Sequence, residues 1–154
     1  MHKRATWMLR TFGLTKVPMI LYTMPTVETL TEEKCLVCIP LNWRTRNHYG
    51  TMFFGALAVG ADCACGLLAM HHVSLSKRRV GLLFKSFRVE FLHRPAGDVL
   101  FGCEQGAQIA AAVQQTIGTG ERVNTALDIE AYLRSDPTEP VARFAMTLSL
   151  KVGL

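Results

Sequence analysis

The sequence predicts an α+β fold in which a curved antiparallel sheet wraps around one long central helix. The first observation is the segment 51–70, which contains no Lys, Arg or Glu and only one acidic residue, Asp62. A helix with so little polar surface has to be covered on nearly all sides. The second observation is a series of later segments in which apolar and polar residues alternate, as in half-buried strands. One sheet does not cover such a helix completely, and a second copy of the chain would finish the burial.

Length and composition indicate one packed domain that spans residues 1–154. Of these 154 residues, 49% are hydrophobic and 19% are charged, which excludes a disordered chain and leaves apolar surface for a subunit interface. The formal net charge of +5 suits an anionic small molecule as well as nucleic acid. We do not expect nucleic acid as a partner, because the aromatic residues fall on strand faces that are predicted to be buried.

The cysteines and the N-terminus indicate a cytoplasmic protein. Five cysteines are an odd number without the spacing of a disulfide framework, which favours a reducing compartment. Cys35 and Cys38 form a C-x-x-C pair in an apolar strand, where positions three apart point to opposite faces, so we interpret them as buried small side chains. No metal or redox cofactor is expected. The basic N-terminus lacks the apolar segment of a signal peptide, and the central helix is interpreted as a core helix, so no membrane partner is expected either.

Before the central helix, short elements with clear boundaries are predicted. In order they are a helix over residues 5–12 ended by Gly13, an apolar strand or wall segment over 19–24 between Pro18 and Pro25, strands over 26–31 and 34–41, and a polar loop over 42–47. One face of the second strand carries Cys35, Val37, Ile39 and Leu41. The first helix is expected to be amphipathic and to lie on the body of the protein.

After the central helix, the pattern changes to strands. The predicted elements are a basic connector over 71–79, a strand over 80–92, a turn over 94–98, a strand over 99–103, a helix over 105–116, and strands over 122–133 and 141–152 joined by a turn over 135–140. The segment 105–116 could continue a curved strand, but the alanine-rich run 110–113 favours a helix, which Gly118 and Gly120 end. The last two strands form a hairpin with one dry and one wet face.

These features together resemble the acyl-CoA thioesterases of the hotdog fold, in particular the phenylacetate-pathway (PaaI-like) type. The resemblance rests on the N-x-x-G of Asn47 and Gly50, on Gly55-Ala-Leu at the helix start, on Asp62 within the helix and on the segment 87–98. It covers nearly the whole chain. It implies a hotdog domain that forms a dimer or a dimer of dimers and hydrolyses acyl-CoA or a related acyl thioester, with coenzyme A as part of the substrate.

One part of the family pattern is changed. In the family, a His-Gly-Gly sequence leads into the helix, and an acidic residue follows eight positions after the first of these glycines. This chain has Phe53, Phe54 and Gly55 in the three positions, and Asp62 lies eight positions after Phe54. A backbone N–H is retained when Gly becomes Phe, but the ring of Phe54 narrows the space for a thioester.

Thioester hydrolysis needs donors for the carbonyl oxygen as it becomes negative and a group that activates water. The free amides of Phe54 and Gly55 at the helix start can serve the first purpose. The Asp62 carboxylate can serve the second as a general base or, less readily, as a nucleophile. Asp62 lies about 12 Å along the helix from Phe54, so the two groups must come from two antiparallel helices in two subunits.

The other candidate residues have both a functional and a structural interpretation. Asp62 itself could be a buried carboxyl that is hydrogen-bonded across an interface, and Asn47 could orient the substrate or only cap the loop. The candidates for substrate binding are His48, Gly50, Phe53, Cys65, Arg78 and Arg79.

His48 could assist as an acid or simply cover the loop, and Phe53 could form an acyl-pocket wall or belong to the core. Cys65, three residues after Asp62, is expected to line the same helical face. Arg78 and Arg79 could contact the phosphates of coenzyme A or form a solvated connector.

Two alternative functions fit the same fold. A non-catalytic hotdog protein would bind an acyl chain, an acyl-CoA or a hydrophobic effector, and the changes at Phe53 and Phe54 favour this alternative. A dehydratase would require a paired histidine and carboxylate, which the sequence does not show. A thiol-release assay over several acyl-CoAs separates the hydrolase from the binding protein.

Overall fold

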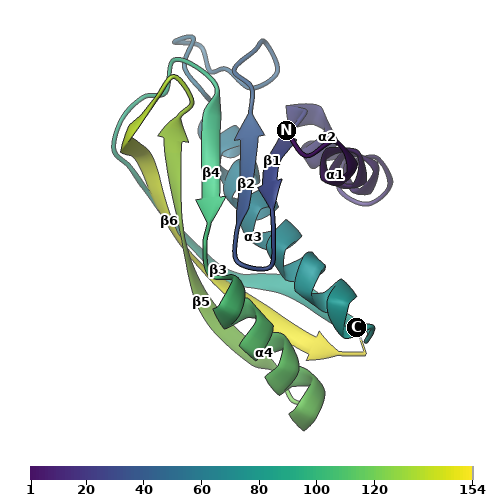
Figure 1. Cartoon of the computed structure of the whole chain (residues 1–154). Coiled ribbons are helices and arrows are strands. Elements are labelled where there is room, and N and C mark those ends of the chain that lie inside the picture. Colours follow the sequence, from purple (N-terminus) through teal and green to yellow (C-terminus); the bar gives the residue numbers. More distant parts are fainter. Residues whose placement is uncertain (154) are drawn as a thin grey trace.

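The computed structural model describes residues 1–153, in which six strands form one antiparallel sheet and four helices pack around it (Figure 1). In chain order the elements are α1 (Lys3–Thr15), α2 (Pro18–Thr23), β1 (Thr26–Leu30), β2 (Cys35–Ile39), α3 (Phe54–Ser76), β3 (Val80–Phe91), β4 (Val99–Cys103), α4 (Gly106–Thr119), β5 (Val123–Leu133) and β6 (Asp136–Val152). The strand order is β1-β2-β4-β5-β6-β3, and every neighbouring pair is antiparallel. The curved sheet around the long helix α3 confirms the predicted architecture.

The helix α3 packs closely on the sheet because of a glycine. A Cβ atom at Gly60 would overlap the ring of Phe101 on β4, so glycine at this position allows the helix and the strand to approach each other. Other large side chains that are fully buried come from α3, α4, β5 and β6. They include Leu67, Leu68, Ile109, Leu127, Ile129, Leu148 and Leu150. The core therefore lies between α3 and the sheet, and the first turn of α3 lies at its margin.

The segment 19–24 forms a helix and not the predicted strand. Proline fits the first position of a helix because its fixed φ is helical and its missing N–H is not needed there. Pro18 occupies this position in α2, and Met24 ends the helix with a left-handed φ of 54°. Ile20 and Thr23 are buried on the inner side. The two prolines therefore start and follow a short helix, where we had interpreted them as the limits of a strand or wall segment.

The helix α1 continues past Gly13 to Thr15, further than predicted. A Cβ atom at Gly13 would lie 2.7 Å from the backbone nitrogen of Leu21 in α2. The glycine therefore serves the close approach of α1 and α2 and does not end the helix. As predicted, α1 is amphipathic, since Ala5 and Leu9 are buried whereas Trp7 is exposed.

The helix α3 extends to Ser76, so most of the predicted basic connector is helical. His72 is buried, and its Nε2 atom lies 2.8 Å from the carbonyl oxygen of Glu32 in a hydrogen bond. This contact holds the last turns of the helix against the β1–β2 hairpin. Lys77 then adopts a left-handed φ of 53°, and the connector shortens to residues 77–79.

The predicted turn over 135–140 is also shorter in the structure, because β6 already starts at Asp136. The pairing of β5 with β6 is irregular between Ala131 and Leu133, which accommodates prolines in the opposite strand. Prolines 137 and 140 therefore lie within β6 and not in a loop.

The strand β2 is covered on both faces. Cys35, Val37 and Ile39 are buried on one face and Cys38 is buried on the other, as predicted for both cysteines, whereas Leu41 follows Pro40 outside the strand. All five cysteines lie in the described range, and each is a free, buried thiol. By length and composition alone α3 is able to cross a membrane, yet it packs on the sheet like the core helix of a globular domain.

Candidate active site

The loop before α3 is held by Asn47. Its Oδ1 atom accepts hydrogen bonds from the backbone N–H groups of Tyr49 (2.9 Å) and Thr51 (3.2 Å). Its Nδ2 atom donates to the Thr51 hydroxyl at 2.9 Å. Gly50 has a φ of +78°, a left-handed conformation that favours glycine. The Asn47 amide is thus engaged within its own loop, and its role toward a substrate stays a prediction.

The first turn of α3 offers free backbone donors. The N-terminal residues of a helix have N–H groups without a partner in the helix. Ala56 and Leu57 donate to the carbonyl oxygen of Phe53 at 2.9 and 3.2 Å. In the described part of the chain, the N–H groups of Phe54 and Gly55 donate no hydrogen bond. The positive end of the helix dipole adds to these two donors, so the helix start is suited to a developing negative charge.

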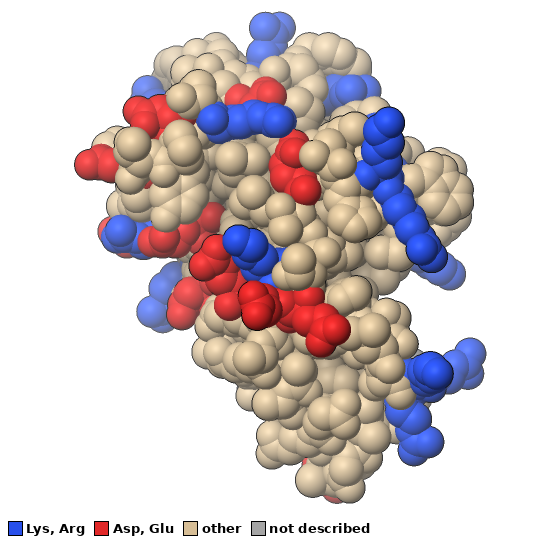
Figure 2. Space-filling model, viewed as in Figure 1, with Lys and Arg blue, Asp and Glu red and all other residues tan. Residues whose placement is uncertain are grey.

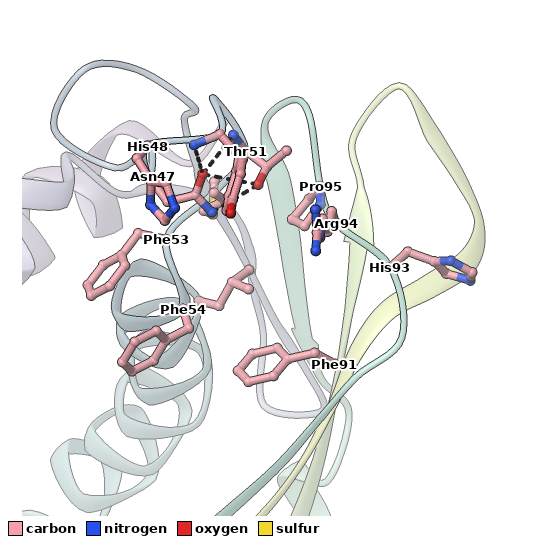
Figure 3. A pocket seen from close by; sticks show the side chains of 12 residues that line it. Asn47, His48, Thr51, Phe53, Phe54, Phe91, His93, Arg94 and Pro95 are labelled. Carbon is pink, nitrogen blue, oxygen red and sulfur yellow. Dashed lines mark hydrogen bonds between the residues drawn. The ribbon is translucent and has the colours of Figure 1, made fainter.

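A cavity of about 370 Å³ opens beside these donors. Figure 3 shows Phe53 and Phe54 on one side of it and Phe91, Arg94 and Pro95 on the other. Its remaining lining residues are Asn47, His48, Tyr49, Thr51, Met52, Leu57 and His93. The side chain of Phe54 is 63% exposed, so its ring lies at the mouth of the cavity and not in the protein core. The interpretation of Phe53 and Phe54 as pocket walls agrees with this placement.

Sequence reasoning did not identify Arg94 as a candidate. Its guanidinium lies 5.4 Å from the centre of the Tyr49 ring, and the His48 and Tyr49 rings lie 4.0 Å apart, so the three side chains form one exposed cluster at the rim. Arg94 follows β3, and the backbone N–H of Met52 bonds the carbonyl oxygen of Pro95 at 2.9 Å. We had interpreted this segment as a turn and as part of the family resemblance, since nothing local in the sequence links it to the helix start.

Asp62 lies a little over two turns further along α3. Its carboxyl is partly exposed and has no hydrogen-bond or ion-pair partner among residues 1–153. Burial among apolar side chains raises the pKa of Asp62 above its usual value. The carboxyl therefore does not satisfy a structural group within its own protomer, and its basicity is increased toward the range of a general base.

Asp62 borders two hollows, each of about 290 Å³, and neither shares a lining residue with the helix-start cavity. One hollow lies between α3 and the strands β3 and β6, lined by Ala58, Val59, Phe84, Phe87 and Met146. The other lies beneath α1 and α2 and, apart from Asp62, is lined by apolar residues. The carboxyl and the free amides thus belong to separate sites of one protomer, about 12 Å apart along the helix axis.

Three further candidates lie away from the helix start. Cys65 is fully buried and contacts Cys103 of β4, so it faces the sheet, whereas Cys63 and Gly66 line the hollow with Asp62. The pKa of the Cys65 thiol is raised by its hydrogen bond to Cys103 and by burial, which favours the protonated thiol. The structure does not bring Cys65 into the lining of either hollow beside Asp62. At about 100° per residue, Cys65 is rotated about 60° from Asp62 toward the sheet, whereas Cys63 and Gly66 are rotated to the opposite side.

Arg78 and Arg79 follow the C-terminal end of α3, whereas Asn47 and the free amides lie at its N-terminal end. A 23-residue helix is about 35 Å long. Their role in substrate binding stays a prediction. In the described range, no group of three or more His, Cys, Asp or Glu residues is placed to hold a metal ion.

The strand β3 forms one edge of the sheet, and its outer side carries no partner strand within residues 1–153. Leu83, Phe87 and Phe91 are 61%, 43% and 50% exposed along it. An unpaired edge strand of twelve residues with exposed apolar side chains is a surface on which a second chain can pair. It borders the hollow that contains Asp62, because Phe84 and Phe87 line that hollow.

The fold and the helix-start geometry define a protein of the hotdog class, as the sequence resemblance implied. More particularly, the chain belongs to the family described as "Domain of unknown function (DUF4442)", whose profile matches residues 5–150. No curated protein matches the sequence.

Several solved structures have the same fold. A protein from Pseudomonas aeruginosa named a probable thioesterase superposes with a TM-score of 0.75 at 20% identity, over 96% of this chain and 95% of that chain. A thioesterase family protein from Silicibacter pomeroyi has a TM-score of 0.68 at 20% identity, over 97% of this chain and 99% of that one. A protein of unknown function from Chlorobaculum tepidum reaches a TM-score of 0.81 at 15% identity, with coverages of 98% and 96%. At these identities the likeness shows the fold, and the PaaI-like assignment stays a prediction.

Proposed function

We propose that this protein hydrolyses acyl-CoA or a related acyl thioester. One observation carries the proposal: a single helix holds two free amide donors at its start and an unpartnered carboxyl of raised pKa at Asp62. Donors for an oxyanion and a base for water are the two groups that the reaction requires. The thioesterase names of two similar structures support the same class of reaction.

The two groups meet only if two protomers combine. We infer a dimer in which the β3 strands pair edge to edge and the α3 helices run antiparallel. Such an arrangement covers the exposed apolar residues of β3, and it sets the first turn of one α3 against the middle of the other. Each dimer then has two equivalent sites, with Asp62 from one subunit and the amides of Phe54 and Gly55 from the other.

In the proposed reaction, the Asp62 carboxylate takes a proton from water while the water oxygen attacks the thioester carbonyl carbon. The carbonyl oxygen becomes negative and accepts hydrogen bonds from the amides of Phe54 and Gly55. The intermediate then collapses, the C–S bond breaks, and the proton held by Asp62 passes to the leaving thiolate. The products are a carboxylic acid and a free thiol, and no metal or redox cofactor takes part.

The remaining candidates are proposed to bind and position the substrate. Asn47 and Gly50 fix the loop that precedes the donors, and His48 and Phe53 line the cavity beside them. Arg94 is the cation of this cavity and is proposed to contact the phosphates of coenzyme A. Arg78 and Arg79 are the alternative phosphate ligands.

The test is a thiol-release assay over straight-chain and aromatic acyl-CoAs with the wild type, Asp62→Asn and the control Asp128→Asn, which alters an exposed aspartate on β5. We expect Asp62→Asn to lower kcat about a hundredfold or more, in the range of a lost general base, and Asp128→Asn to retain activity. Unchanged turnover in Asp62→Asn would exclude the proposed base.

A non-catalytic binding protein is the second candidate. Two phenylalanines occupy the helix start, where the acyl-CoA thioesterases that the sequence resembles have a histidine and a glycine. The same panel distinguishes it. Binding of acyl-CoA in calorimetry without thiol release from any substrate would favour this candidate over the hydrolase.

A further inference from the structure

The hollow beneath α1 and α2 is almost entirely apolar. Its walls come from four elements: Leu9 and Phe12 from α1, Val17 and Ile20 from the α2 region, Cys63, Gly66, Leu67 and Met70 from α3, and Leu82, Leu83 and Phe84 from β3. Asp62 is the only ionisable carboxyl in this lining. Water would find few polar partners in this space, which is therefore suited to an apolar ligand.

The hollow is elongated along α3. Asp62 borders it at one end, and Met70 lies eight residues, or about 12 Å, further along α3. Beyond Met70 it adjoins a surface depression lined by Phe12, Met70 and Leu82 among others, with Lys77 and Arg78 at the outer margin. The space is therefore a groove along α3 that begins at the proposed base and ends at the surface near the C-terminus of the helix.

Close contacts do not explain why position 66 of α3 is a glycine. Glycine inside a helix is destabilising relative to alanine. At Gly60 the close contact with Phe101 explains the glycine, but a Cβ atom at Gly66 would meet only Asp62 Oδ1 and Phe84 Cε2, each at 3.9 Å. These are ordinary contact distances, so packing does not require glycine at this position. What Gly66 contributes is open volume beside Asp62.

We propose that this groove binds the straight aliphatic acyl chain of the substrate, with the thioester at Asp62 and α1 and α2 as its outer wall. The inference rests on the proposed thioesterase function and adds the class of acyl group. At about 30 Å³ per water-sized group, a volume of about 290 Å³ holds a chain of roughly ten carbons. The protein should therefore prefer medium-length straight chains over acetyl and aromatic acyl groups.

The test measures binding without turnover. S-alkyl thioethers of coenzyme A with butyl, decyl and hexadecyl chains cannot be hydrolysed, and their affinities are measured by calorimetry. In the wild type we expect affinity to rise up to about fourfold per methylene (about 0.8 kcal/mol each) as far as decyl and to gain little beyond it. Affinity that does not depend on chain length would overturn the proposal.

Gly66→Leu places a side chain in the groove, and Gly118→Leu is the matched control, since Gly118 lies in α4 with no atom within 4 Å of a Cβ there. We expect Gly66→Leu to lose at least tenfold in affinity for the decyl compound and little for the butyl compound, with no change in Gly118→Leu. If Gly66→Leu does not fold, Met70→Trp narrows the far end and should reduce decyl binding in the same selective way. If Gly66→Leu lowers the affinity equally for every chain length, the groove holds the pantetheine arm and the proposal is overturned. A loss of affinity for all compounds in Arg78→Ala would point to the same placement of the pantetheine arm.

The same reagents separate this inference from the function on which it rests. If the chain-length dependence and the Gly66→Leu effect appear but no acyl-CoA is hydrolysed, the hydrolase proposal fails and the acyl-chain site stands. If acyl-CoAs are hydrolysed but neither effect appears, the hydrolase proposal stands and the acyl-chain site fails.

Discussion

At its first turn α3 presents backbone donors to an open cavity with an arginine at the rim, whereas two turns later it presents a carboxyl to apolar walls. The first region has exposed aromatic rings, Arg94 and no acid. The second has Asp62, a raised pKa and no hydrogen-bond donor in the described chain. Each region holds what the other lacks for thioester hydrolysis. The comparison teaches that one protomer carries two half-sites, because a straight helix keeps residues 54 and 62 about 12 Å apart.

The largest effect is expected when one backbone donor is removed from the first region. Phe54→Pro deletes an N–H at the first position of α3, where proline is favoured, and Phe53 already has the extended conformation (φ −68°, ψ 138°) that precedes proline. Loss of one oxyanion donor should lower kcat about a hundred- to a thousandfold. Phe54→Ala keeps the N–H and serves as the control in the thiol-release assay. If both variants retain full activity, the helix start does not stabilise the oxyanion.

A second experiment asks whether the two half-sites belong to different subunits. Inactive Asp62→Asn and inactive Phe54→Pro protein are mixed and allowed to exchange subunits. Activity should return to about a quarter of the wild type, because half of the randomly formed dimers are mixed and each of these has one intact site of two. Each variant mixed with itself is the control. Recovery no greater than in these controls would mean that both groups act within one protomer.

The third and smallest effect concerns the stability of the second region. Burial raises the folded-state pKa of Asp62, so the carboxyl favours the folded state most when protonated, and this contribution is lost as the pH rises from the unfolded-state pKa through the folded-state pKa. Asp62→Asn should therefore have a higher Tm than the wild type at pH 8, and the gap should shrink toward pH 4. Thermal unfolding across this range measures it, with Asp128→Asn as the exposed control.

In the wild type, kcat/KM should fall at acidic pH, since the base must be deprotonated to act. The midpoint of this fall should lie at a pH above the usual aspartate pKa. If the Tm difference between wild type and Asp62→Asn does not change with pH, burial does not raise the pKa of Asp62.

The long stretch without charged residues other than Asp62 was enough to predict the central helix, and the alternating patterns were enough to predict the strands that wrap it. The misassigned elements depend on contacts between distant segments. Gly13 looked like a helix end because its role, the approach of Leu21, lies in another helix. The segment 71–76 looked like a connector because the contact of His72 with Glu32 joins residues 40 positions apart.

The candidate site was partly predictable for the same reason. Asp62 stood out because a single acid in an apolar helix is conspicuous, and the donors at Phe54 follow from any helix start. Arg94 and Gly66 were missed, since their position beside these groups depends on β3 and on the packing of α1 and α2.

By itself, the sequence determined that a nearly uncharged helix carries one carboxyl and must be wrapped by alternating strands, because hydrophobic burial follows from local periodicity. Only the tertiary structure decided which flank of that helix remains open. The wall opposite Asp62 comes from the chain's first twenty residues and from an edge strand some twenty positions after it, and no local pattern records how such distant segments meet.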